Sequence, residues 1–159
     1  MIYGAIDEKS KKTYTFLKEI FTAINNKQIE YNWLITKAEI LAHSDELDLL
    51  NTKEYCFLSG EKLTKIVTQN DSQWIWGVLS GFDKNIPLEE ILKYPFPDAD
   101  GYPGFWKNPL SIQHPLATVE IVPWDSSLVL IFSKNKEIVD NFREAFPKSQ
   151  DLSEFNAQV

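Results

Sequence analysis

The segment Trp74–Phe82 constrains the fold of this chain more than any other. Written as an extended strand, one face carries Trp74, Trp76, Val78, Ser80 and Phe82, and the other carries Ile75, Gly77, Leu79 and Gly81. A strand that is mostly apolar on both faces is buried between two layers. The glycines leave room for a neighbouring element to approach closely. We therefore predict a central strand here, covered on both sides.

Further strand patterns occur at 1–6, 31–36, 54–58, 117–124 and 128–133. The last two flank Asp125–Ser126 and predict a hairpin. Because Pro123 cannot donate a hydrogen bond to a neighbouring strand, we expect the first arm at a sheet edge or with a bulge near its end. Apolar spacing predicts helices at 10–26, 45–50, 60–68, 88–92 and 135–146. Ser44 and Ser59 are predicted to cap the second and third of these.

A chain of 159 residues is the size of one domain. Strands and helices alternate irregularly, which favours the α+β class over a regular parallel-sheet fold. We predict a single α+β domain over residues 1–159, with a mixed or antiparallel sheet of about five or six strands and helices packed on it. The apolar tail residues Leu152 and Phe155 are candidates to dock on this body.

Residues 94–115 contain five of the eight prolines and are predicted to form a long loop. Long ordered loops in compact domains are commonly functional. The loop carries Asp98, Asp100, Tyr102, Phe105 and Trp106, and we predict that these residues bind a partner. Its aromatic residues have a second interpretation, in which they anchor the loop to the body. His114 is either a solvent-facing residue or a general base.

The charge balance of the chain excludes some partners and favours others. With 16 basic and 23 acidic residues, the net charge is −7. This charge disfavours nucleic acid and anionic membranes, and the sequence has no apolar run long enough for a spanning helix. Asp45, Glu46 and Asp48 lie close together in the sequence. They are either a solvated face or a surface for a basic protein partner, and we predict the latter.

The residues that usually hold metals are sparse. Two histidines and one cysteine, with no two at ligand spacing, argue against a zinc site. The Asp98-Ala99-Asp100 sequence leaves a metal–nucleotide site formally open, although two aspartates beside glycine are more often turn formers. No nucleotide-binding or hydrolase motif is present, so we expect no metal, no cofactor and no catalytic residue. The single Cys56 is predicted to be a buried, inert thiol in a cytoplasmic protein.

Part of the sequence resembles a family of small bacterial proteins with no assigned function. The resemblance rests on the hairpin 119–134 with its Trp124-Asp125-Ser126-Ser127 turn, the following helix with Phe146-Pro147, the tail 151–156 and the segment Trp74–Ser80. In size, charge and lack of motifs the chain is also similar in type to toxin-immunity proteins, including those of contact-dependent inhibition. That likeness implies a cytosolic protein that binds a basic toxin.

The leading hypothesis is therefore a non-enzymatic, immunity-type protein. It would neutralise a cognate bacterial toxin, such as a nuclease, by occluding its active surface, and it would be a monomer or weak dimer. A second hypothesis is a small enzyme or ligand-binding domain with a pocket under the 94–115 loop. A third is a structural or regulatory module of an uncharacterised family.

Overall fold

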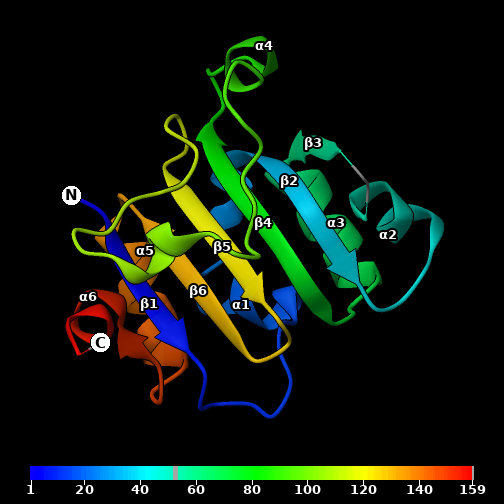
Figure 1. Ribbon diagram of the computed structural model, residues 1–159. Coiled ribbons are helices and arrows are strands. Elements are labelled where there is room, and N and C mark those ends of the chain that lie inside the picture. The colour runs from blue at the N-terminus through cyan, green and yellow to red at the C-terminus, as the bar shows by residue number, and fades with distance from the viewer. Residues whose placement is uncertain (52–53, 159) are drawn as a thin grey trace.

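The strand β4 (Trp74–Asp83) lies inside a seven-stranded sheet with the order β3-β2-β4-β5-β6-β1-β7. Figure 1 shows the strands from β3 to β1 side by side. The computed structural model describes residues 1–51 and 54–158. All neighbouring strands pair antiparallel, so the sheet is antiparallel rather than mixed. The other strands are β1 (Tyr3–Asp7), β2 (Tyr31–Ile40), β3 (Tyr55–Ser59), β5 (Val119–Trp124), β6 (Leu128–Ser133) and β7 (Gln150–Asp151). The α+β class is confirmed, and the additional strand is the short β7.

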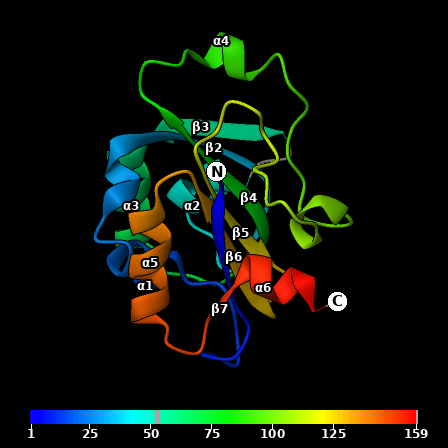
Figure 2. The ribbon, with the colours of Figure 1, turned by 90° about the vertical axis from the view of Figure 1, so that its left-hand side faces the viewer.

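Two different layers cover the sheet, as Figure 2 shows edge-on. The helices α1 (Leu17–Ala23), α3 (Gly60–Gln69) and α5 (Lys136–Ala145) cover one face, which we call the helix side. The other face is covered by the 94–115 loop and by α6 (Leu152–Ala157), and we call it the loop side. The remaining elements are α2 (Asp45–Leu50), α4 (Leu88–Ile91) and the 3-10 turns η1 (Lys27–Glu30) and η2 (Pro103–Trp106).

The two-layer prediction for β4 is confirmed, with one correction. Val78 and Trp76 pack on the loop side, and Leu79 packs on the helix side. Trp74, however, joins the helix-side core instead of the face that strict alternation predicts. The reason is an irregular register between β2 and β4 near Trp76 and Trp74, where alternation between faces breaks.

Neighbouring side chains approach the backbone of Gly81 closely, as predicted for the glycines of β4. A side chain there would collide with Val119 and would come within 3.1 Å of the Trp33 ring. Both Val119 and Trp33 are buried, so the absence of a side chain at Gly81 lets the sheet and its helix-side core pack tightly.

The first helix is shorter than the predicted 10–26. Phe16, directly before Leu17, is extended, and the chain is held beside β4 there because Thr15 and Trp74 exchange two backbone hydrogen bonds of 2.9 and 2.8 Å. This contact joins positions far apart in the sequence, so local spacing could not reveal it. The caps at Ser44 and Ser59 are confirmed, since their hydroxyl oxygens accept the backbone N–H groups of Leu47 and Lys62.

The hairpin between β5 and β6 forms around Asp125–Ser126 as predicted. Both residues have positive φ, 50° and 56°, and the Ser127 N–H donates to the Trp124 carbonyl at 3.1 Å, so they occupy the centre of a β-turn of the mirror-image type common in hairpins. Three residues, 125–127, separate the paired residues Trp124 and Leu128. β5 is an interior strand, but it pairs with β4 only over Val119–Ile121. Pro123 therefore pairs only with β6. At this position β5 has one neighbouring strand, as expected for a proline that cannot donate a hydrogen bond.

The two edges of the sheet differ in length. β7 has two residues and leads directly into α6. β3 has five residues and pairs with β2 without a register shift from Tyr55 to Ser59. Among residues 1–51 and 54–158, no helix is long and apolar enough to cross a membrane.

Candidate functional site

The 94–115 loop is fixed to the sheet by hydrogen bonds. The Thr36 hydroxyl on β2 donates to the Pro97 carbonyl at 2.7 Å. The Gln113 side chain accepts the Asp98 N–H at 2.8 Å and donates to the Asp98 carbonyl at 3.0 Å. Because these bonds join the two ends of the loop to each other and to the sheet, the loop is an ordered layer of the fold.

The large aromatic residues of the loop mainly anchor it. Phe105 is fully buried, with its ring centroid 5.8 Å from that of Phe132 on β6. It therefore has no surface to offer a partner, which corrects its assignment as a binding residue. Trp106 is half-buried beside Trp124 and Phe155, with centroid distances of 5.8 and 6.4 Å. Tyr102 is half-buried with its ring edge against Phe105. The roles of Trp106 and Tyr102 in binding stay predictions.

His114 is a buried structural residue, which corrects the expectation of a solvent-facing side chain. Its Nε2 lies 2.9 Å from the Ile91 carbonyl, and its Nδ1 lies 3.1 Å from the Leu116 N–H. These bonds require a neutral ring protonated on Nε2. Burial lowers the pKa of His114, which favours that neutral form. Both ring nitrogens are already engaged, so neither is placed to take a proton from a substrate.

The two loop aspartates form a turn. An Asp98 carboxylate oxygen accepts the Asp100 N–H at 3.2 Å, and Gly101 follows with φ of 79°. This is the turn-forming role of such residues. No group of three or more His, Cys, Asp or Glu side chains in the part of the chain that the structure describes could hold a metal ion.

A buried acid, Glu120, lies beneath the loop and was not among the residues predicted from the sequence. Glu120 on β5 is fully buried; one carboxyl oxygen accepts the Gln113 N–H at 3.2 Å, and no partner is described for the other. Ser80 lies opposite it on β4 and is equally buried. Desolvation raises the pKa of Glu120 to about 8, while the Gln113 N–H acts in the opposite direction. The carboxyl group is therefore neutral at neutral pH.

The acidic residues Asp45, Glu46 and Asp48, here called the α2 acids, are exposed on the first turn of α2. Leu47 and Leu50 of the same helix are buried in the helix-side core, so α2 presents its charged face outward. The Asp48 carboxylate Oδ1 lies 3.3 Å from the His43 Nδ1. The 94–115 loop lies on the opposite side of the sheet, so the α2 acids and the loop aspartates do not form one surface.

The α2 acids lie beside the open sheet edge. A hollow of about 420 Å³ is formed by Asp48–Leu50 of α2, Tyr55–Leu58 of β3, and Lys62 and Ile66 of α3. Leu49 is 58% exposed at this place. Cys56 is half-buried, a correction to the predicted full burial, and its burial raises the pKa of the thiol. This arrangement combines an acidic helix turn, exposed apolar surface and a strand that, among residues 1–51 and 54–158, pairs on one side only.

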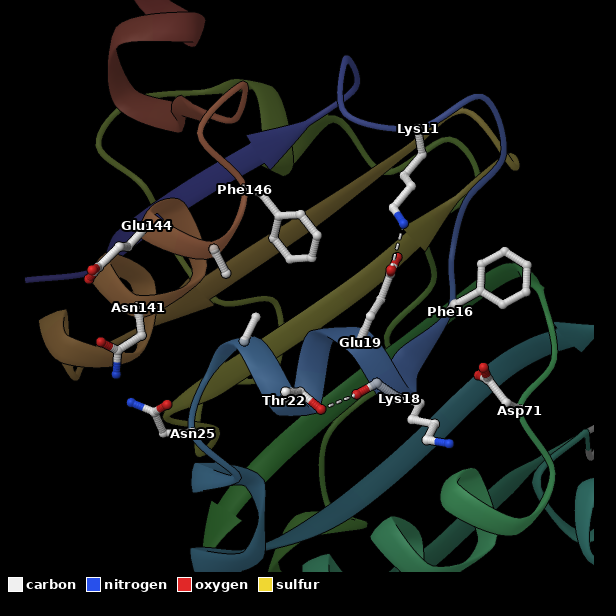
Figure 3. A pocket seen from close by; sticks show the side chains of 12 residues that line it. Lys11, Phe16, Lys18, Glu19, Thr22, Asn25, Asp71, Asn141, Glu144 and Phe146 are labelled. Carbon is white, nitrogen blue, oxygen red and sulfur yellow. Dashed lines mark hydrogen bonds and ion pairs between the residues drawn. The ribbon is translucent and has the colours of Figure 1, made fainter.

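A larger hollow of about 880 Å³ lies between α1 and α5 on the helix side, shown in Figure 3. Phe16 and Phe146 line it, and an ion pair of 2.7 Å between Lys11 and Glu19 crosses its upper part. Its lining comes from three distant parts of the sequence, so no spacing rule could have identified it. This hollow is not the pocket that the second hypothesis placed under the 94–115 loop. Under the loop, Phe105 and Leu110 pack in one apolar cluster with Val78.

Comparison with known proteins gives one family. Residues 5–97 match the family described as "Protein of unknown function (DUF2691)". No curated protein and no solved structure matches the chain. The expectation of an uncharacterised family is thus confirmed, although the matched range includes Trp74–Ser80 and ends before the hairpin on which the resemblance mostly rested. The comparisons give no support to the likeness with toxin-immunity proteins.

Proposed function

Because the chain belongs to the DUF2691 family, which is described as having unknown function, we propose a role for it from its own surface: it is a non-enzymatic protein-binding module. Its partner is a basic protein, and the α2 acids form the charged rim of the contact. The observation that carries this proposal is the exposed acidic turn of α2 beside the exposed Leu49 and the open edge of β3.

The chemistry of this surface suits protein recognition. Exposed carboxylates attract a basic partner and speed its association. Leu49 and the half-buried Tyr55 and Phe57 provide apolar area next to these charges. A contact with an apolar centre and a charged rim is typical of protein interfaces. The net charge of −7 acts in the same direction at longer range.

Within this proposal, a basic nuclease toxin is the most specific partner. A nuclease surface that binds phosphates is positively charged, and an acidic protein that covers it would block the nucleic acid. This is the immunity role, which we place in the cytoplasm. The support for it is the acidic surface together with the likeness in type described above.

The test uses the product of the neighbouring gene, because an immunity gene lies next to its toxin gene. We expect that product to be basic, to be toxic when expressed alone and to be harmless when expressed with this chain. Asp45→Asn, Glu46→Gln and Asp48→Asn together should slow its association with the chain about tenfold at low salt. The association rate of the unmodified chain should fall as salt rises, since exposed charges are screened over about 8–10 Å.

A matched control removes three charges elsewhere. Glu89→Gln, Glu90→Gln and Glu144→Gln change the net charge equally, on α4 and near the end of α5. This control should leave association within about twofold of the unmodified chain. Equal slowing by both triple variants would mean that only net charge matters. A neighbouring product that is not toxic would end the immunity proposal.

A further inference from the structure

We propose that the edge strand β3 accepts an extended, basic segment of the partner as an additional strand of the sheet. This inference rests on the proposed function and specifies how the partner binds. In strand addition, backbone hydrogen bonds supply affinity, and alternate side chains of the added strand contact the two faces of the sheet.

The first argument is that β3 lacks the usual protection of a sheet edge. Natural edges are protected by being short, by proline or lysine, by bulges, or by a covering element. β7 at the opposite edge has two residues and is followed at once by α6. β3, with the sequence Tyr-Cys-Phe-Leu-Ser, has five residues, no proline, no charged residue and a regular register with β2. Within the described part of the chain, it pairs with β2 alone.

The second argument is that apolar side chains flank this edge on both faces. Tyr55 and Phe57 pack on the loop side, where the Phe96 ring lies 5.3 Å from that of Tyr55 and is 38% exposed. On the helix side, Leu49 is 58% exposed beside the hollow that Cys56 also lines. An added strand would therefore find apolar contacts for its side chains on either face of the sheet.

The third argument concerns which occupant fits. A second copy of the chain, paired through β3, would bring two sets of α2 acids to the same interface. Like charges placed together at an interface repel one another, so self-pairing is disfavoured at neutral pH. A segment with lysine or arginine at alternate positions would instead place its cations next to the α2 acids. Charge complementarity thus selects a basic partner over a second copy.

The experiment uses a short peptide of alternating lysine and valine with the full chain. Cys56, the single cysteine, is the second residue of β3 and is half-buried, so its alkylation by iodoacetamide reports access to the strand. We expect saturable slowing of alkylation by about fivefold or more, as the added strand covers the thiol. Amide hydrogen exchange should slow in β3, whereas exchange at Gln150 and Asp151 in β7 should not change.

Two control peptides separate the inference from the function on which it rests. A lysine–valine peptide N-methylated at every residue keeps its charges but cannot donate backbone hydrogen bonds, and it should leave β3 unprotected. Equal protection by this peptide would overturn strand addition while leaving the acidic binding surface intact. A glutamate–valine peptide should bind about tenfold more weakly. Equal binding of that peptide would overturn the basic preference and the proposed function together.

The remaining outcomes also decide the question. If no peptide slows alkylation or exchange in β3 at millimolar concentration, strand addition at this edge is wrong. If the chain alone sediments as a dimer at neutral pH, with β3 amides already protected, the occupant is a second copy and the proposal is overturned. The triple variant Asp45→Asn, Glu46→Gln and Asp48→Asn should still fold. It should bind the lysine–valine and glutamate–valine peptides equally.

Discussion

Glu120 shows how a single residue couples the loop to pH. Its carboxyl group has no described basic partner, and it holds the loop through the Gln113 N–H. The nearby Tyr102 is affected in turn: burial is the main cause of its raised pKa, and the charge of Glu120 contributes. The neutral acid is therefore the form that suits this buried place, because an unpaired buried carboxylate is costly.

The first prediction at this scale follows from the raised pKa of Glu120, about 8 compared with an ordinary value of 4.5. Between these values the folded chain keeps a proton that the unfolded chain loses. The free energy of unfolding should therefore fall as pH rises through this window, by up to about 1.4 kcal/mol per pH unit from this group. Glu120→Gln stays neutral and should remove this contribution. Urea unfolding at about pH 5.5 and about pH 7.5 measures the difference; equal pH slopes for both chains would contradict it.

The sequence predicted exposed charges better than it predicted the positions of aromatic residues. The α2 acids are exposed as expected, because charged residues on a helix turn rarely have another place. Phe105 and His114 are buried, although their loop has no periodicity. Phe105 packs against Phe132 of β6 and His114 against Phe82 of β4; both partners are far away in the sequence, so no local pattern contains that information. The same holds for Glu120, whose surroundings exist only once the loop covers it.

Among the elements, the helix caps and the turn between β5 and β6 were predictable because their causes are local. A serine before a helix accepts a nearby N–H group, and a tight turn between apolar strands depends mainly on its own few residues. The extended backbone before Leu17 was not predictable, because Thr15 is held by Trp74. The faces of β4 were predictable up to the irregular register with β2, where Trp74 changes sides.

The hairpin turn gives a prediction at the scale of elements. Ser126 has φ of 56°, where a residue with a side chain is strained and glycine is not. Its backbone N–H and carbonyl bond to Ile75 and Tyr14, and Ser126→Gly keeps both groups. We expect this change to raise the free energy of unfolding by about 0.5 kcal/mol. Ser127→Gly is the matched control, since Ser127 is not among the residues with positive φ; it should lower that energy. Thermal unfolding of both variants checks the signs, and stabilisation by both would refute the argument.

For the whole molecule, the sheet order shows that the family match is not an independent folding unit. β1, which begins two residues before the matched range 5–97, pairs with β6 and β7, and β4 pairs with β5. All three of these partner strands lie beyond residue 97. The matched range therefore contains strands whose neighbours are elsewhere in the chain.

We accordingly predict that a chain of residues 1–97 alone will not fold cooperatively. Its β1 would lack both partner strands, and α1 would lose its contact with α5. The amide proton spectrum should show little dispersion and denaturant unfolding should lack a sharp transition. Adding residues 98–159 as a separate chain should restore dispersion. A sharp transition for residues 1–97 alone would show that the sheet tolerates the loss of three strands.

The same sheet order fixes how the protein can be made. A ribosome delivers β1 long before the strand that pairs with it along its full length, β6, which begins at Leu128. At ordinary rates of synthesis, roughly ten seconds separate the two. During this interval the apolar residues Ala5 and Ile6 have no strand to pair with, so the nascent chain must be kept from aggregating until β6 has left the ribosome.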